Sequence, residues 1–97
     1  MKEKPVRWNH EKNIELMLER GVSFEEILSS IEQRGLLTVL DHPNQQEYPN
    51  QKIWVVKLRG YAHLVRLVDS GVDISLKTIM PSRKATTLYL PEVSDED

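Results

Sequence analysis

Three segments in the second half of the chain are rich in β-branched and aromatic residues and follow one another closely. They span residues 52–58, 61–68 and 74–80, and they are separated by Arg59-Gly60 and by residues 69–73. A parallel crossover needs about a dozen residues or more, so connections this short join antiparallel neighbours. The sequence therefore predicts an antiparallel meander, to which the apolar segment 36–40 adds a fourth strand.

The first third of the chain has helical periodicity instead. Residues 9–20 predict a helix that Asn9 caps and Gly21 ends, and its residues Ile14, Met17 and Leu18 are spaced to share one face. We expect this apolar face to belong to the core.

A second helix is indicated by a capping box at Ser23 and Glu26, in which each residue bonds the backbone of the other. The apolar residues after it follow the i, i+3, i+4, i+7 pattern of a buried helix face: Phe24, Ile27, Leu28 and Ile31. Arg34-Gly35 predicts the end of this helix, with Gly35 in the left-handed position. Both helices are expected to pack on one face of the sheet.

Together these elements predict an α+β fold in which two N-terminal helices pack on a four-stranded antiparallel sheet. Residues 41–51 form a long polar connection, a candidate for binding. Residues 82–90 are either one short helix or an extended edge, which Pro91 ends. We expect one domain over residues 1–90, and a disordered acidic tail over residues 91–97.

The charge is distributed unevenly along the chain. Residues 52–91 contain seven basic and two acidic residues, a net charge of +5, although the formal net charge of the whole chain is −2. The last six residues contain four acidic residues and no basic one. Such a tail is usually solvated, and the alternative is that it shields the basic face or contacts a partner.

Several kinds of site are excluded or disfavoured by the composition. The chain has no cysteine, which excludes disulfides, thiolate zinc sites and cysteine nucleophiles. His10, His42 and His63 are scattered, so we expect no metal, and the thin core of so short a chain leaves no room for a large cofactor. No apolar run is long enough for a membrane span or a secretion signal, which predicts a cytoplasmic protein without membrane contact.

Arg66 is the unusual residue of the strand predicted over residues 61–68. Alternation places it with Ala62, Leu64 and Val68, and a charge among such neighbours is costly unless it is paired or directed at a ligand. The alternative is a solvated arginine at a strand end or an exposed edge. Lys57 and Lys77 lie on the neighbouring strands, and each alone is equally consistent with a solvated face. Cations clustered on adjacent strands would instead suit the phosphates of a nucleic acid.

Cleavage of RNA requires a proton acceptor, a proton donor and groups that stabilise charge on phosphorus. His63 titrates near neutral pH and is the best candidate for proton transfer, although a single histidine in a sheet is often structural. Tyr61, Tyr48 and Tyr89 could stack on a base or donate a proton, and each could equally be a packing residue. The chain lacks the spacings of serine hydrolases, paired-carboxylate enzymes and P-loop proteins.

Two stretches of the chain resemble the BrnT family. The first is Trp8-Asn9-His10-Glu11-Lys12 followed by Arg20-Gly21-Val22-Ser23-Phe24-Glu25-Glu26, and the second is residues 79–86, which end in Arg-Lys-Ala-Thr. The order of the motifs and the spacing from Trp8 to Gly21 agree with the family pattern. The similarity covers roughly residues 6–90, almost the whole chain.

The resemblance implies a RelE-like fold and a ribonuclease toxin of a type II toxin–antitoxin system that blocks translation. Its implied partner is a small antitoxin of ribbon-helix-helix type that also binds operator DNA. Arg83 and Lys84 match the family's Arg-Lys step beside the proposed active face. Lys77 falls where the family often has a basic residue on the last strand, and Arg66 and Lys57 are placed by strand order.

The first hypothesis is thus a metal-independent endoribonuclease. It assigns Arg66, Arg83, Lys77 and His63 to catalysis, and Lys57, Lys84 and Tyr61 to RNA binding. The alternative is a non-catalytic module of the same fold that binds RNA or a partner and acts mainly through a complex with an antitoxin.

Overall fold

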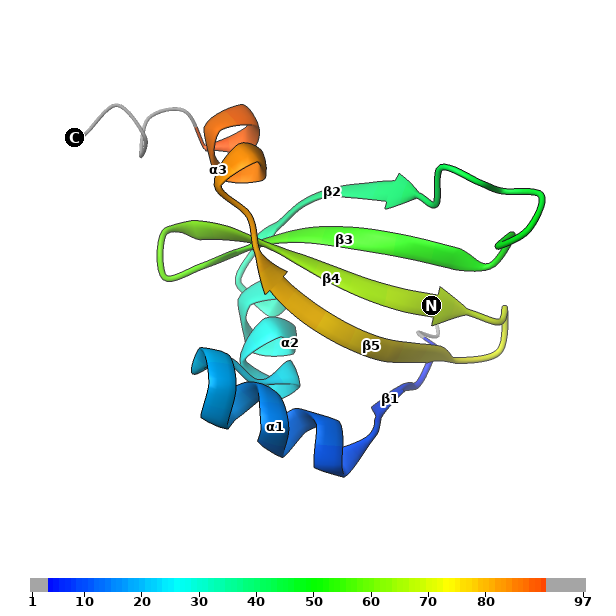
Figure 1. Ribbon diagram of the computed structural model, residues 1–97, viewed down its shortest axis with the longest axis horizontal. Coiled ribbons are helices and arrows are strands. Elements are labelled where there is room, and N and C mark those ends of the chain that lie inside the picture. Colours follow the sequence, from blue (N-terminus) through cyan, green and yellow to red (C-terminus); the bar gives the residue numbers. More distant parts are fainter. Residues whose placement is uncertain (1–3, 91–97) are drawn as a thin grey trace.

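The computed structural model describes residues 4–90 and has an α+β fold, with a five-stranded mixed sheet and three helices (Figure 1). In chain order the elements are β1 (Val6–Trp8), α1 (His10–Arg20), α2 (Phe24–Glu32), β2 (Leu36–Asp41), β3 (Gln51–Leu58), β4 (Tyr61–Asp69), β5 (Ile74–Pro81) and α3 (Arg83–Tyr89). The predicted acidic tail, residues 91–97, lies outside the described residues.

The sheet has the strand order β1-β5-β4-β3-β2, and its four longer strands form the predicted antiparallel meander. The prediction of four strands was incomplete, because β1 pairs in parallel with β5 through Val6 opposite Ile74 and Trp8 opposite Leu76. Three residues are too few to show strand alternation in a sequence. This strand exists because β5 offers a free edge, where the Ile74 amide donates to the Pro5 carbonyl oxygen over 2.9 Å.

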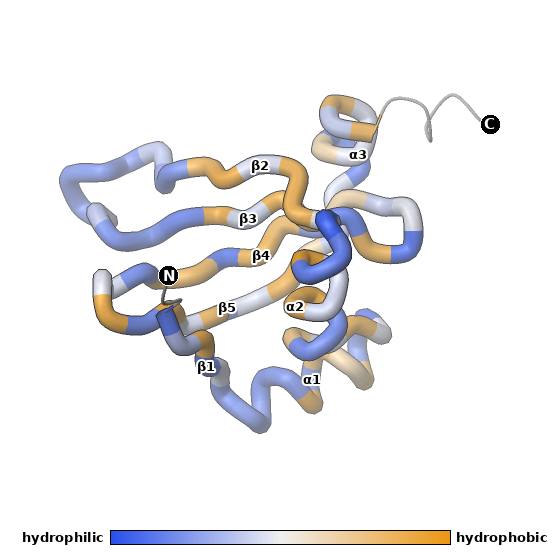
Figure 2. Tube along the Cα trace, turned by 180° about the vertical axis from the view of Figure 1, so that it is seen from behind, coloured by the Kyte–Doolittle hydropathy of each residue, from blue (hydrophilic) through white to orange (hydrophobic). Residues whose placement is uncertain are grey.

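The helices lie on both faces of the sheet. Seen from behind, α2 stands in front of the strands and α1 lies below it (Figure 2), whereas α3 lies apart from both (Figure 1) and packs through Ala85 on Val55 and Ala62 of the opposite face. The main core is the layer between the sheet and the first two helices, where Leu16, Phe24 and Ile27 are completely buried against Val56 and Val65. This confirms the prediction that α1 and α2 share one face of the sheet.

The predicted inward face of α1 was wrong. The residues that α1 buries are Asn13 and Leu16, while Leu18 remains 81% exposed. Asn13 determines this orientation, because its Oδ1 accepts a hydrogen bond from the Phe24 amide over 2.8 Å and its Nδ2 donates to Glu25 over 2.7 Å. Two bonds to the start of α2 turn this face inward, and the apolar set Ile14, Met17 and Leu18 is left largely exposed.

The start of α2 agrees with the prediction, and its end differs. Ser23 and Glu26 form the capping box, each accepting from the other's amide over 3.1 Å. At the end of α2 the left-handed residue is Arg34, with φ of 69°, and not Gly35. The position of Gly35 instead has no room for a side chain, because a Cβ there would lie 2.7 Å from the Ser30 carbonyl oxygen.

The connection between β3 and β4 is a two-residue turn. Arg59 and Gly60 have φ angles of 53° and 77°, the pair of positive values typical of a type I′ hairpin. The guanidinium of Arg59 donates to Glu26 over 2.8 Å and to the Gly21 carbonyl oxygen over 2.7 Å. These bonds attach the hairpin to both helices, which helps to hold a non-glycine residue in this conformation.

The long connection between β2 and β3 is closed by local contacts. The rings of His42 and Tyr48 lie 4.5 Å apart, and the Asn44 amide donates to His42 Nδ1 over 3.0 Å. Tyr48 thus contacts a residue of its own connection, while 38% of its side chain remains exposed. Among the described residues, no helix has the length and apolar character needed to cross a membrane.

Candidate functional site

Side chains of β4 alternate between the two faces of the sheet as predicted. Val65 lies opposite Trp54 and Ile79 and is fully buried beneath the helices, whereas Arg66 lies opposite Ile53 and Thr78 and is exposed. Arg66 therefore stands on the face turned away from α1 and α2. We call this the open face, and its residues on the three central strands include Ile53, Val55, Lys57, Ala62, Leu64, Arg66, Val68, Thr78 and Met80.

One end of the open face is covered by α3. The helix begins at a Ser82 cap, whose amide donates to the Ala62 carbonyl oxygen over 3.0 Å, and the Ala62 amide donates to Thr86 Oγ1 over 2.9 Å. Ala85 packs in a small second core with Val55 and Ala62. The segment left open by the sequence is thus a helix, and it is attached to the middle of the sheet.

A groove of about 200 Å³ runs between α3 and the strands beside it. We call it the α3 groove, and its lining residues are Leu40, Val55, Leu64, Ser82, Lys84, Ala85, Leu88 and Tyr89. Most of this lining is apolar, and Lys84 supplies its only charge. Tyr89, a candidate for base stacking in the sequence, belongs to this groove.

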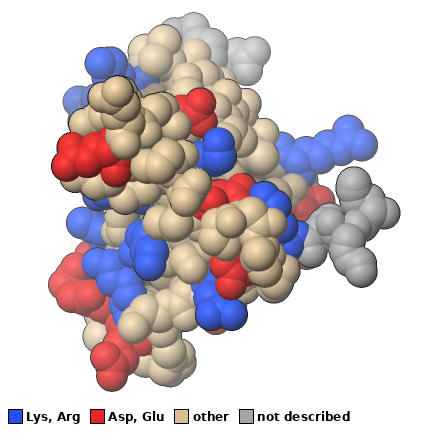
Figure 3. Space-filling view, turned by 90° about the vertical axis from the view of Figure 1, so that its right-hand side faces the viewer, with Lys and Arg blue, Asp and Glu red and all other residues tan. Residues whose placement is uncertain are grey.

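The cations of the open face differ in their pairing from those at one end of the sheet. At the end that carries the β2–β3 and β4–β5 connections, lysine and arginine side chains pair with aspartates, and Figure 3 shows blue and red side chains interspersed there. The pairs are Lys4–Asp69, Arg7–Asp73 and Lys52–Asp41. Within residues 4–90, no carboxylate pairs with any of the five candidate cations Lys57, Arg66, Lys77, Arg83 and Lys84.

The five candidate cations lie on three strands and on α3. Leu64 and Lys84 line the same groove, and Arg66 follows Leu64 by two residues, about 6.6 Å along the strand. Arg83 precedes Lys84 at the start of α3. Lys57 stands opposite Ala62 at the hairpin end of the face.

Lys77 lies on β5, next to Thr78, the residue that pairs with Arg66. The register between β4 and β5 shifts so that Leu67 faces Leu76 while Arg66 faces Thr78, and Lys77 is the extra residue. It lines a hollow beside β1 together with Arg7 and Trp8. Of the candidate cations, Lys84 lines the α3 groove with Leu64, Arg66 lies two residues further along β4, and Arg83 belongs to the first turn of α3.

His63 and Tyr61 lie on the other face of β4. His63 is opposite the buried Val56, is only 7% exposed, and its Nδ1 is bonded to the Tyr61 carbonyl oxygen over 3.1 Å. Burial lowers the pKa of His63 below its ordinary 6.5, and this outweighs the Tyr61 hydrogen bond, which raises it. A group beneath the sheet cannot transfer a proton to a phosphate held above it, so His63 and Arg66 do not form one site.

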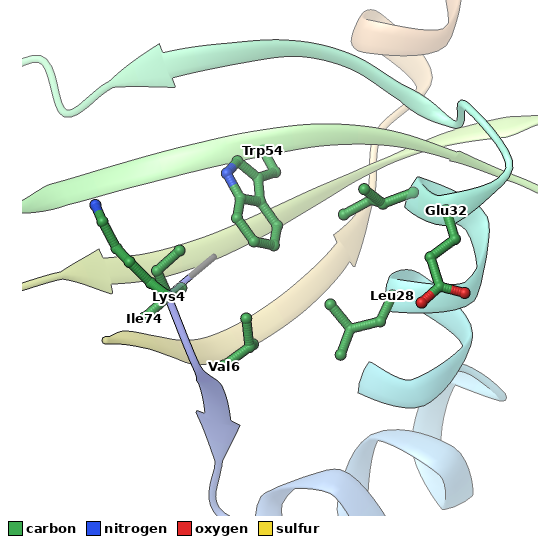
Figure 4. A pocket seen from close by; sticks show the side chains of 7 residues that line it. Lys4, Val6, Leu28, Glu32, Trp54 and Ile74 are labelled. Atoms are coloured by element: carbon green, nitrogen blue, oxygen red, sulfur yellow. The ribbon is translucent and has the colours of Figure 1, made fainter. Parts of the chain in front are cut away.

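A larger hollow of about 640 Å³ lies on the helix side of the sheet, between β1 and α2. Trp54 points into it from β3, with Val6 and Leu28 on its walls (Figure 4). Sequence reasoning did not single out Trp54. The sequence did contain a signal for this hollow. Two short helices cannot cover one whole face of a sheet, so a tryptophan on the uncovered part of that face is expected to line a hollow.

No metal centre is formed by the described side chains, since residues 4–90 contain no group of three histidine or acidic residues placed to hold an ion. No family model matches the chain, and neither a curated protein nor a solved structure matches it. A functional proposal therefore depends on the charges and shape of the open face, together with the motif resemblance.

Proposed function

We propose that the open face binds the phosphate backbone of RNA. The observation that carries the proposal is the contrast in pairing, because the cations on and beside this face have no carboxylate partner in residues 4–90 while Lys4, Arg7 and Lys52 do. An unpaired cation is available to a phosphate, and each phosphate it neutralises releases bound counterions.

The surroundings of Arg66 favour a phosphate ligand. Its nearest cross-strand neighbours are Ile53 and Thr78, and Leu64, two residues before it, lines the α3 groove together with Lys84. The guanidinium of Arg66 is exposed, so a phosphate can reach it and form paired charge-assisted hydrogen bonds with it. The apolar α3 groove, which Lys84 lines, is suited to the sugar or base that accompanies each phosphate.

Under this proposal the chain is a ribonuclease toxin of a type II toxin–antitoxin pair, with a BrnT-like, RelE-like fold, acting in the cytoplasm. The 2′-hydroxyl of the substrate would attack the adjacent phosphorus and lose its proton to water, while the bond from phosphorus to the 5′-oxygen of the next nucleotide breaks and that oxygen takes a proton from water, which leaves a 2′,3′-cyclic phosphate. Arg66 and Arg83 would stabilise the negative charge that develops on the phosphate oxygens. No step requires a metal. A small ribbon-helix-helix antitoxin would neutralise the toxin.

A second candidate is a non-catalytic RNA-binding module of the same fold. The observation that favours it is the position of His63, which is buried on the opposite face from Arg66. The open face then binds RNA without an imidazole to move a proton. Both candidates use the same binding surface, so binding and cleavage need separate measurements.

Binding is tested by the fluorescence anisotropy of a labelled single-stranded RNA, titrated with the full chain at several salt concentrations. We expect Arg66→Ala to weaken binding about tenfold, a loss of roughly 1.4 kcal/mol typical of a charge-assisted hydrogen bond. The slope of log affinity against log salt should fall by about 0.7, the value for one lost contact to a single-stranded phosphate.

Lys12→Ala is the matched control for charge, because Lys12 lies on α1, away from the open face, and pairs with Glu15. It removes one positive charge from the helix side of the sheet and should leave affinity within about twofold. Equal losses in the two variants would show that only net charge matters, and the open face would then not be the binding surface.

A further inference from the structure

We infer that the acidic segment 91–97 occupies the α3 groove and the cations beside it, where it competes with nucleic acid. The docking itself stands on geometry and charge, and only its inhibitory consequence rests on the proposed function. The segment reads Pro-Glu-Val-Ser-Asp-Glu-Asp, with four carboxylates around a single apolar residue, Val93.

The point at which the segment leaves the domain carries this inference. Leu90 follows α3 directly and is half-buried against the second core of Val55, Ala62 and Ala85. Two of these residues, Val55 and Ala85, also line the α3 groove. The described chain therefore ends, at Leu90, beside the groove and on the open face of the sheet.

The distances permit the contact. The helix α3 has seven residues and is about 10 Å long, so the whole groove lies near Leu90. Seven extended residues can span roughly 23 Å, which is more than enough to reach Lys84 and Arg66. The segment needs no rearrangement of the described fold in order to reach either cation.

The charge and size of the α3 groove also match the composition of the segment. The groove is apolar apart from Lys84, and a valine side chain fits a space of about 200 Å³. With Val93 in the groove, the carboxylates on either side of it could reach Lys84 and Arg66, neither of which pairs with a carboxylate in residues 4–90. The larger hollow beside Trp54 fits this segment less well, because its lysine, Lys4, already contacts both oxygens of Asp69 at 2.8 Å.

The test uses the full chain with its acidic residues neutralised as Glu92→Gln, Asp95→Asn, Glu96→Gln and Asp97→Asn. We expect this variant to bind labelled single-stranded RNA about fivefold more tightly at low salt, and the difference to disappear at high salt as charges are screened. The matched control neutralises four acidic residues of the described helices, as Glu11→Gln, Glu15→Gln, Glu19→Gln and Glu32→Gln. An equal gain in the control would overturn the inference, since net charge alone would explain it.

A second readout does not depend on RNA. Amide NMR spectra of the unaltered chain and the neutralised variant, recorded without nucleic acid, should differ at Leu40, Leu64 and Lys84 and agree along α1. Identical spectra would overturn the docking, as would differences that vanish on dilution, which would show binding to a second copy. Differences at the groove in a chain that binds no RNA would support the docking while refuting the proposed function.

Discussion

Arg66 and His63 belong to the same strand, three residues apart, and their side chains leave β4 on opposite faces. Arg66 is exposed on the open face, and His63 is 7% exposed beneath the helices. The groups expected to bind phosphate and to transfer protons are thus separated by the sheet itself. His63 should consequently affect the stability of the protein and not the chemistry of the open face.

The first prediction concerns stability against pH. Burial lowers the pKa of His63 below 6.5, so the unfolded chain takes up a proton at a pH where the folded chain does not. The free energy of unfolding should therefore be highest above about pH 6.5 and decrease as the pH falls below that value. Urea denaturation at pH 7.5, 6.5 and 5.5 measures the decrease.

His63→Asn is the control, because the asparagine amide can still donate a hydrogen bond to the Tyr61 carbonyl oxygen and does not titrate. The variant should lose less stability between pH 7.5 and 5.5 than the unaltered protein. Glu25 and Asp69 do not interfere in this range, since their pKa values are lowered from 4.5 and 3.8 by hydrogen bonds from Asn13 and Lys4 respectively. Parallel curves for the two proteins would show that His63 is not responsible.

The second prediction separates the enzyme from the binding module. Purified protein should cleave total RNA in the presence of EDTA, and Arg83→Ala should reduce the rate at least a hundredfold, as expected for loss of a group that stabilises charge in the transition state. Arg83 is an exposed residue in the first turn of α3, so the Arg83→Ala substitution should change the free energy of unfolding by less than about 0.5 kcal/mol. Intact RNA with the unaltered protein, together with salt-dependent binding, would identify a non-catalytic module.

The sheet could be predicted largely because connection lengths restrict its topology. The Arg59-Gly60 turn and the short 69–73 connection leave antiparallel pairing as the only solution for β3, β4 and β5. The orientation of α1 could not be predicted, because apolar periodicity favours Ile14 and Leu18, and the deciding hydrogen bonds of Asn13 go to residues of another helix.

The sequence predicts which face of its strand a candidate residue occupies. It does not predict how candidate residues on different elements lie relative to one another. Alternation alone placed Arg66 on the face opposite His63. The distance from Arg66 to Lys77 depends on a register shift that no sequence pattern marks, and the position of Arg83 depends on where α3 packs. The relative positions of cations from several elements are a tertiary property, so they required the structure.

The third prediction tests the link between the first two helices. Asn13→Ala removes the acceptor for the Phe24 amide, a buried donor that would then have no partner, and should destabilise the protein by about 2 kcal/mol. The urea midpoint should fall with an unchanged slope. Asn9→Ala, which removes the exposed cap of α1, is the comparison and should cost only about 1 kcal/mol. Equal losses of stability in the two variants would mean that the burial of Asn13 does not increase the contribution of its hydrogen bonds to stability.

The fourth prediction concerns space at Gly35. A Cβ at this position would lie 2.7 Å from the Ser30 carbonyl oxygen and 3.1 Å from that of Lys57, both backbone atoms that a side-chain rotation cannot move. Gly35→Ala should therefore destabilise the protein by about 2 kcal/mol or more. Gly60→Ala, where a Cβ meets nothing within 4 Å but φ is 77°, separates backbone strain from steric overlap. A smaller loss at Gly35 than at Gly60 would contradict this assignment.

The fifth prediction is a stabilising change at Arg34. Its φ of 69° places an L-residue in the left-handed region, at a cost of about 1 kcal/mol, and its exposed side chain forms no ion pair within residues 4–90. Arg34→Gly should remove this strain and raise the free energy of unfolding by about 0.5–1 kcal/mol, measured by urea denaturation. Arg34→Ala removes the same charge and keeps the strained backbone, so it should change stability by less than about 0.5 kcal/mol. If alanine stabilises the protein as much as glycine does, the gain comes from the lost charge, and the left-handed conformation of Arg34 carries no measurable cost.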